Sequence, residues 1–361
     1  MTGDTEARRV IEDARRAGTF PAASFEVGDG DAAIWTGAVG ALTFDTAAPP
    51  AGVRTPFDLA SLTKVIATTS VVMDLFGRGA LRLEEPVSAF FADWRGVDRE
   101  AVTVRDLLEH SSGLPARLID APPATRREFE HDIGTIRLEY APRTASLYSD
   151  LGFILLGFLA ADRGGATLAE QFDRITVRLE PNTTYAGNHG DILSFNLPPD
   201  VRALAAPTRP MDADTRRGRL LVGDVHDNYA AALGGAAGHA GLFGTAPAVG
   251  AFARRILRAA RGAAGATLPF TPALVKTFTA RTTVPGSSRA LGWDTMLPTS
   301  SCGTRMSREA FGHVGFTGTS LWIDPTRDRY FVLLTNRACG GGTLEQMRAV
   351  RRAFHDALGD V

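Results

Sequence analysis

Apolar side chains recur at helical spacing near both ends of the chain. Residues 5 to 17 carry theirs among alternating charges, which is typical of an amphipathic surface helix. We expect two further helices in the C-terminal part, at residues 246 to 260 and 343 to 358.

Short apolar segments bounded by turn residues predict strands close to these helices. Residues 22 to 27 and 32 to 36 flank a glycine-rich turn, which is typical of a β-hairpin. Strands near both termini indicate one sheet built from the two ends of the chain. Four more strands are expected towards the C-terminus, at residues 291 to 296, 311 to 314, 320 to 323 and 330 to 335.

The middle of the chain is dominated by helical segments and loops. Residues 116 to 145 and 181 to 232 show little periodicity, so we expect mostly loop with some helix in the first segment and a loop-like excursion in the second. Helices are expected at residues 61 to 76, 103 to 110 and 149 to 162.

These elements predict an α/β (α+β) protein of two domains. Residues 1 to 65 together with 236 to 361 are expected to form an antiparallel sheet flanked by helices. Residues 66 to 235 are expected to form a mostly helical insertion. A functional site is expected at the interface of the two domains, where pockets form most readily.

Composition narrows the class of protein. The 361 residues are 44% hydrophobic, which is enough for sizeable cores. A net charge of −1, with arginines scattered among acids, argues against nucleic acid as a partner. No apolar stretch is long enough to predict a membrane span, and the charged N-terminus lacks the apolar core of a secretory signal. We therefore expect a cytoplasmic protein unless a leader was removed. Cys302 and Cys339 are expected to be free thiols. The sequence does not predict the oligomeric state.

Ser61 and Lys64 form the first candidate for chemistry. They lie in the first turn of the apolar helix, where positions three apart share one face and the amine can reach the hydroxyl. The positive end of the helix dipole favours a serine alkoxide and disfavours a charged lysine. The alternative is an ordinary amphipathic helix with a capping serine and a solvated lysine.

Lysine is rare in this chain, which makes Lys64 informative. Only Lys64 and Lys276 are lysines among the 39 basic residues. Arginine does not give up its proton in proteins, whereas a desolvated lysine can become neutral and act as a base. We therefore expect an uncharged amine at Lys64, next to the Ser61 hydroxyl.

Two other segments carry candidate groups. Tyr148 and Asp150 stand at the start of an apolar helix, and a tyrosine beside a cationic lysine can relay a proton, although an isolated tyrosine in a loop is more often a packing residue. Gly315 and Gly318, before a late strand, allow backbone N–H groups to approach a ligand and bind a developing oxyanion. A twisted edge strand with bulges is the alternative for the glycines.

Together these motifs resemble the serine β-lactamase and penicillin-binding-protein superfamily. Ser61-x-x-Lys64, Tyr148-x-Asp150 and His313-x-Gly315 follow its S-x-x-K, Y-x-N and K-T-G order. The chain is most similar to class C β-lactamase-related serine hydrolases, which include esterases and D-peptidases. The resemblance covers nearly the whole chain, with further matches at residues 107 to 115, 148 to 157, 234 to 243 and 322 to 325.

The resemblance implies roles for individual residues. Ser61 would be the acylated nucleophile, Lys64 and Tyr148 the pair that handles the proton, and the backbone N–H groups of Ser61 and Phe316 the oxyanion hole. The positions of Asp150, His313 and Gly315 would bind substrate. A small molecule or short peptide is the implied substrate, and no cofactor or metal is implied.

The departures from the family pattern affect the expected substrate. Asp150 stands in place of the usual asparagine, and His313-Val314-Gly315 replaces Lys-Thr-Gly. The usual lysine and threonine help to hold a carboxylate, and histidine is charged only if its pKa is raised. We therefore favour an esterase or peptidase over an efficient β-lactamase; the alternatives are a true class C-like β-lactamase and a non-catalytic penicillin-recognising protein.

His226, His239 and Arg337 are three further polar residues for which a structural role is favoured over a functional one. His226, next to Asp227, and His239 could be imagined as metal ligands, but their spacing matches no metal motif and loop packing is favoured. Arg337, after the last strand, could reach a substrate, although a solvated strand end is the simpler interpretation.

Overall fold

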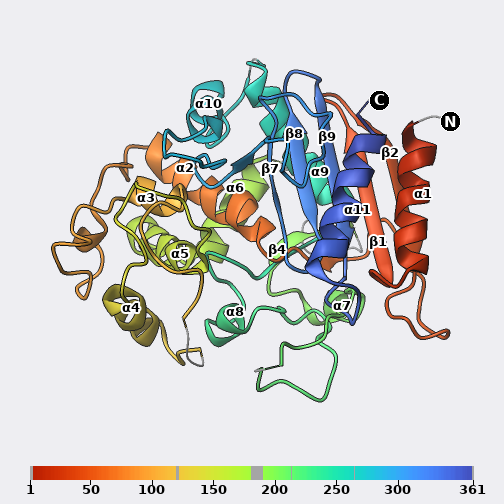
Figure 1. Ribbon diagram of the computed structural model, residues 1–361, viewed down its shortest axis with the longest axis horizontal. Helices are drawn as coiled ribbons and strands as arrows, with labels where there is room; N and C mark the ends of the chain where they lie inside the picture. The colour runs from red at the N-terminus through yellow and green to blue at the C-terminus, as the bar shows by residue number, and fades with distance from the viewer. Residues whose placement is uncertain (1–2, 119–121, 180–189, 213, 264, 360–361) are drawn as a thin grey trace.

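An antiparallel sheet of six strands forms the centre of the molecule (Figure 1). The computed structural model describes residues 3–118, 122–179, 190–212, 214–263 and 265–359. The strand order is β2-β1-β9-β8-β7-β6, so the first and last strands of the chain pair directly. The strands are β1 (Ala22–Gly28), β2 (Ala33–Gly40), β6 (Asp294–Thr295), β7 (Phe311–Val314), β8 (Ser320–Asp324) and β9 (Arg329–Thr335).

Helices cover both faces of this sheet (Figure 1). α1 (Gly3–Arg16) and α11 (Leu344–Ala357) pack against each other on one face, and α9 (Ala246–Ala260) packs on the other. Side chains alternate along β9: Phe331 and Leu333 enter the core under α1 and α11, whereas Val332 and Leu334 enter the core on the α9 side. The predicted class is confirmed, because an antiparallel sheet built from both chain ends is flanked by helices.

Helices predominate in the middle of the chain, on the left of Figure 1. Helices α6 and α10 and a small second sheet of order β3-β5-β4 were not predicted from the sequence. Division into two domains at residues 65 and 235 stays a prediction. The helices are α2 (Thr69–Gly77), α3 (Val104–Leu108), α4 (Arg126–Thr135), α5 (Asp150–Gly164), α6 (Leu168–Leu179), α7 (Pro199–Arg202), α8 (Asn228–Ala232) and α10 (Pro272–Thr279).

One strand of the small sheet is formed by a segment that was expected to be loop. β4 (Leu193–Phe195), α7 and α8 interrupt the excursion predicted for residues 181 to 232, and residues 180–189 lie outside the described part. β5 (Leu242–Gly244) joins β4 to β3 (Phe57–Asp58), just before Ser61. Three-residue strands carry too little alternation to be recognised, because their pairing partners are distant in sequence.

No single helix among the described residues is long and apolar enough to cross a membrane. The bent pair α5 and α6 reaches the length and apolar composition of a membrane span only when the two helices are taken together.

Glu26 on β1 gives the sheet a pH-dependent stability. The carboxyl is buried, accepts a hydrogen bond from Tyr330 Oη at 2.7 Å, and lies 3.7 Å from Arg254 Nη2. Burial raises the pKa of Glu26 to about 7, with Tyr330 and Arg254 opposing the rise. The unfolded chain releases this proton at lower pH than the native protein, so the free energy of unfolding falls as pH rises from about 4.5 towards 7.

Replacement of Glu26 by Gln is expected to flatten this pH dependence. The amide cannot ionise, and its oxygen can still accept from Tyr330. Urea unfolding at about pH 5 and pH 7.5 is expected to show a decline on the order of 1–3 kcal/mol in the wild type and a smaller one in Glu26→Gln. Glu6→Gln on the exposed face of α1 is the control, and an equal decline in wild type and Glu26→Gln would contradict the assignment.

Candidate active site

Ser61 is presented at the start of a helix by a strained turn. The turn follows β3, and Ala60 adopts a left-handed conformation with φ of 48°. The buried Asp58 carboxylate holds the turn by accepting the Ala60 N–H at 2.8 Å and the His226 N–H at 2.6 Å. Ser61 remains partly exposed, and a π-helical segment, Lys64–Thr68, begins three residues later.

Lys64 is fully buried, and its ammonium has three acceptors. Nζ lies 3.1 Å from Ser61 Oγ, 2.8 Å from Asp150 Oδ1 and 2.9 Å from His239 O. Burial acts against the charge, but Asp150 and Tyr148 outweigh burial and raise the pKa of Lys64 above its ordinary value. The expectation of an uncharged amine is therefore wrong, since the carboxylate of Asp150 stabilises the ammonium ion.

Tyr148 completes the arrangement around the serine. Its hydroxyl donates to Ser61 Oγ at 2.7 Å, and Lys64 Nζ lies 4.9 Å from the centroid of its ring. The ring packs on His110 just before α5, which Ser149 caps by accepting the Gly152 N–H. Burial raises the pKa of Tyr148 above its ordinary value, although Lys64 opposes the rise. The resting phenol is neutral and points at the serine.

Asp150 takes part in a chain of alternating charges, and its role in substrate binding stays a prediction. Its Oδ1 accepts from Lys64, and its Oδ2 lies 2.9 Å from Arg117 Nη1. Arg117 Nη1 also lies 2.8 Å from Asp227 Oδ2, whose other oxygen lies 2.7 Å from His239 Nε2. Although burial opposes it, the charge of Lys64 holds the pKa of Asp150 below its ordinary value. Both oxygens of Asp150 therefore have cationic partners inside the protein.

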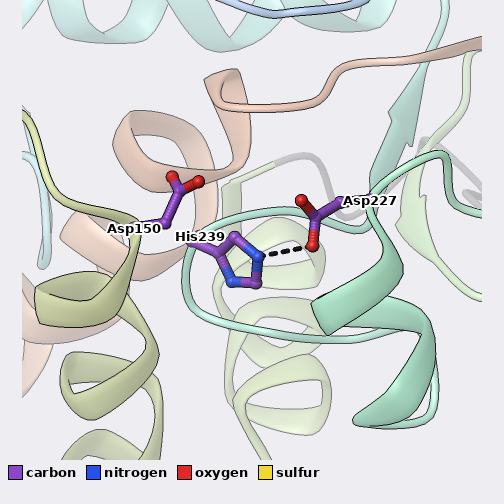
Figure 2. A group of neighbouring side chains, drawn as sticks. All are labelled: Asp150, Asp227 and His239. Carbon is purple, nitrogen blue, oxygen red and sulfur yellow. Dashed lines mark hydrogen bonds and ion pairs between the residues drawn. The ribbon is translucent and has the colours of Figure 1, made fainter. Parts of the chain in front are cut away.

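Figure 2 shows the acidic part of this network. Asp150 starts α5, Asp227 caps α8, and His239 reaches between them from a loop, with its ring turned to Asp227. Ligand atoms of these three residues lie within 4.8 Å of one another, a separation that a metal ion could bridge. Lys64 and Arg117 already neutralise the two carboxylates, so the cluster serves to fix Lys64 and gives no ground for a metal.

The turn between β7 and β8 brings Phe316 next to the serine turn. Thr317 Oγ1 donates to Asp58 O at 2.7 Å, and Thr319 Oγ1 donates to Leu59 O at 3.0 Å. A Cβ on Gly315 would lie 2.5 Å from Leu59 O, so this close approach requires glycine. The hairpin is thereby fixed against the strand that leads to Ser61.

The amides of Gly315 and Gly318 are not free for an oxyanion, contrary to expectation. Gly315 N donates to Thr319 O at 2.8 Å, and Gly318 N donates to Gly315 O at 3.1 Å, because both close the turn. Across the described residues, the N–H groups of Ser61 and Phe316 have no protein acceptor. These two amides are therefore the ones available to a developing oxyanion.

His313 lies close to Tyr148 but does not present a donor. It is buried, and Nδ1 lies 2.8 Å from Val314 O, which assigns the ring proton to Nδ1 and leaves Nε2 as an acceptor. Burial, with Arg289 and Lys64, lowers the pKa of His313 well below its ordinary value. His313 is therefore uncharged and offers Nε2 as an acceptor, and its role in substrate binding stays a prediction.

Space for a ligand adjoins the β7–β8 turn. A cavity of about 380 Å³ is lined by Phe316, His226, Arg209 and Arg337, among others, and the His226 ring stacks on Phe316. A larger cavity of about 1050 Å³ lies between α10, the edge strand β6 and its neighbour β7, and none of the serine-site side chains lines it. Ser61, Lys64 and Tyr148 line neither of these two cavities; the smaller one adjoins the site through Phe316.

Arg117 was not predicted as a site residue, and Asp227 and His239 were expected only to pack in a loop. Arg117 stands in a loop rich in proline and arginine, where nothing distinguishes it from the other arginines. The only available signal was Asp150, because a buried carboxylate in place of an amide requires a cationic partner.

Comparison with known proteins gives a consistent result. Residues 7–354 match the family model described as Beta-lactamase. A Bacillus subtilis (strain 168) protein named N-acetylmuramyl-L-alanine amidase is 32% identical over 305 residues, which cover 79% of this chain and 68% of that protein.

Solved structures share the fold. The Beta-Lactamase/D-Alanine Carboxypeptidase from Pseudomonas syringae superposes with a TM-score of 0.75 at 16% identity, covering 98% of this chain and 98% of that chain. EstCE1, a hydrolase with promiscuous acyltransferase activity, has a TM-score of 0.73 at 19% identity, covering 97% of this chain and 98% of that chain.

Proposed function

The chain belongs to the Beta-lactamase family, and from this premise we propose that it is a serine hydrolase acting through an acyl-enzyme at Ser61. The proposed substrate is a small molecule or short peptide with an ester or amide bond. The observation that carries the proposal is the convergence of Tyr148 Oη at 2.7 Å and Lys64 Nζ at 3.1 Å on the partly exposed hydroxyl of Ser61.

Because Lys64 is charged, Lys64 and Tyr148 have different roles in activating Ser61. An ammonium whose three N–H groups are occupied cannot accept the serine proton. Tyr148 is therefore the base: the phenol first releases its own proton to solvent, and the phenolate, stabilised by the neighbouring ammonium, then accepts the proton of Ser61.

The reaction then follows from the geometry. Ser61 Oγ attacks the carbonyl carbon while its proton moves to Tyr148 Oη, and the N–H groups of Ser61 and Phe316 bind the negative oxygen. Tyr148 returns the proton to the leaving group as the carbon–heteroatom bond breaks. Water repeats these steps on the acyl-enzyme and releases Ser61.

The preference for a substrate class rests on His313. Its ring supplies no charge to hold a substrate carboxylate, since burial lowers the pKa of His313 well below its ordinary value, although the guanidinium of Arg289 lies 5.3 Å from the centroid of the Tyr148 ring. Names of similar proteins include an amidase, a Beta-Lactamase/D-Alanine Carboxypeptidase and a hydrolase with promiscuous acyltransferase activity, so they are compatible with ester, amide or β-lactam hydrolysis. We therefore propose an esterase or peptidase and place β-lactam hydrolysis second.

A fluorophosphonate probe with peptide mass mapping tests the proposal. The expected result is one labelled peptide that contains Ser61 and no label in Ser61→Ala. Label on another residue, or none, would refute the proposal. Sustained nitrocefin turnover by the purified protein, absent in Ser61→Ala, would instead favour a β-lactamase, and a stable penicilloyl adduct without turnover of any ester would favour a penicillin-recognising protein.

A further inference from the structure

Two buried arginines lie behind the turn that carries Phe316. Arg351 on α11 is 5% exposed and Arg337 after β9 is 8% exposed. Neither forms an ion pair with a carboxylate among the described residues, which is uncommon for buried cations. Both guanidinium groups are instead directed at backbone carbonyls of the turn.

Arg351 binds the peptide group whose N–H has no acceptor among the described residues. Its Nη2 donates to Gly315 O at 2.6 Å and to Thr319 O at 2.9 Å. The carbonyl of Gly315 and the N–H of Phe316 belong to one planar, conjugated peptide unit. A charge-assisted hydrogen bond to this oxygen draws electron density from the nitrogen and makes the N–H a stronger donor.

Arg337 fixes the next peptide group. Its Nη2 and Nε donate to Phe316 O at 2.6 Å and 3.2 Å, and its Nη1 donates to Gly342 O at 3.0 Å. The two carbonyls on either side of the Phe316 amide are therefore both held by cations. This arrangement orients the amide and leaves its N–H unpaired on the opposite side.

We propose that Arg351 is a positioning residue that polarises the Gly315–Phe316 peptide and so strengthens the oxyanion hole, with Arg337 holding the adjoining carbonyl. The inference rests on the proposed acyl-enzyme mechanism. Arg351 does not touch the substrate; it acts through the Phe316 N–H. Its effect is therefore largest when negative charge develops on the substrate oxygen and small for substrate binding.

The matched pair of variants is Arg351→Met and Arg352→Met. Arg352 is the next residue on α11 and also donates to backbone carbonyls, those of Pro298 and Ser300, at 3.1 Å and 2.6 Å, but far along the chain from the β7–β8 turn. Arg351→Lys keeps the charge with a shorter reach. All variants are normalised to the number of sites that a fluorophosphonate labels, which removes any loss of folded protein.

Two readouts separate polarisation from structural support. The acylation rate per active site with p-nitrophenyl butyrate is expected to fall about 10-fold in Arg351→Met with little change in substrate affinity, less than the roughly 100-fold or greater loss when an oxyanion donor is removed. The infrared band of the ester carbonyl in the trapped acyl-enzyme is expected to shift to higher wavenumber. Arg351→Lys is expected to lie between wild type and Arg351→Met, and Arg352→Met to match wild type.

The outcomes distinguish this inference from the proposed function. Unchanged acylation per site and an unchanged carbonyl band in Arg351→Met would overturn the inference while the acyl-enzyme mechanism stands. Absence of any acyl-enzyme at Ser61 in the wild type would refute the mechanism and with it the inference. If Arg351→Met yields no folded protein, the same two measurements are made on Arg351→Lys. An acylation rate and an ester carbonyl band equal to those of the wild type in Arg351→Lys would count against polarisation by the planar guanidinium.

Discussion

Ser61→Ala is expected to lower turnover of p-nitrophenyl esters by about 10⁴-fold or more. The hydroxyl forms the covalent bond to the acyl group, and neither Lys64 nor Tyr148 can take its place in that step. The loss is therefore expected in kcat, with the fold and substrate binding retained. Steady-state kinetics on active-site-titrated wild type and on the variant at equal protein concentration measure the effect.

Ser70→Ala is the control for this substitution. Ser70 lies on α2, is buried, and its hydroxyl has no hydrogen-bond partner among the described residues. It is expected to keep wild-type activity. Turnover by Ser61→Ala within about 10-fold of the wild type would show that another group is the nucleophile.

Tyr148→Phe is expected to lower kcat/KM for acylation by about 10³-fold. The phenol is the group that takes the serine proton, since the occupied ammonium of Lys64 cannot. Because burial raises the pKa of Tyr148, only a small phenolate fraction exists at neutral pH, and the wild-type rate is expected to rise with pH between about 6 and 9. The residual activity of Tyr148→Phe is expected to lack this rise.

Tyr330, a buried tyrosine of the large sheet, provides the control for Tyr148→Phe. Tyr330→Phe removes a hydroxyl that donates to Glu26, remote from the serine turn in the fold, and is expected to leave the pH–rate profile unchanged. A Tyr148→Phe enzyme with the full pH dependence of the wild type would exclude the phenol as the base.

The sequence was sufficient for the residues whose function depends on local spacing. Ser61 and Lys64 are one helical turn apart, and Tyr148 precedes a helix with a recognisable cap, so each could be placed before the fold was known. Strands β1, β2, β8 and β9 of the large sheet were equally accessible, because an apolar or alternating pattern along five to eight residues is a strong signal, whereas β6 is only Asp294–Thr295 within the strand predicted at residues 291 to 296. The predicted roles of these residues still await the experiments above.

The charges around Ser61, Lys64 and Tyr148 depend on contacts between residues that are distant in sequence. Lys64 meets Asp150 across 86 residues, and Arg117 meets Asp227 across 110, so the ammonium state could not be derived from a helix dipole alone. Arg351 is one of several arginines on an amphipathic helix, and only the fold directs it to Gly315 O. Pairing of buried charges is a tertiary property that local spacing does not encode.

The ionisation state of Lys64 is the point on which this mechanism depends, and the two-lysine composition makes it measurable. In protein labelled with lysine that carries ¹³C at Cε, two resonances are expected, and Lys64→Arg identifies that of Lys64. The mechanism predicts that the Lys64 resonance keeps its ammonium position from about pH 6 to pH 10 in the wild type and titrates at lower pH in Asp150→Asn. A wild-type Lys64 resonance that moves to the amine position near neutral pH would contradict it and return the role of base to the lysine.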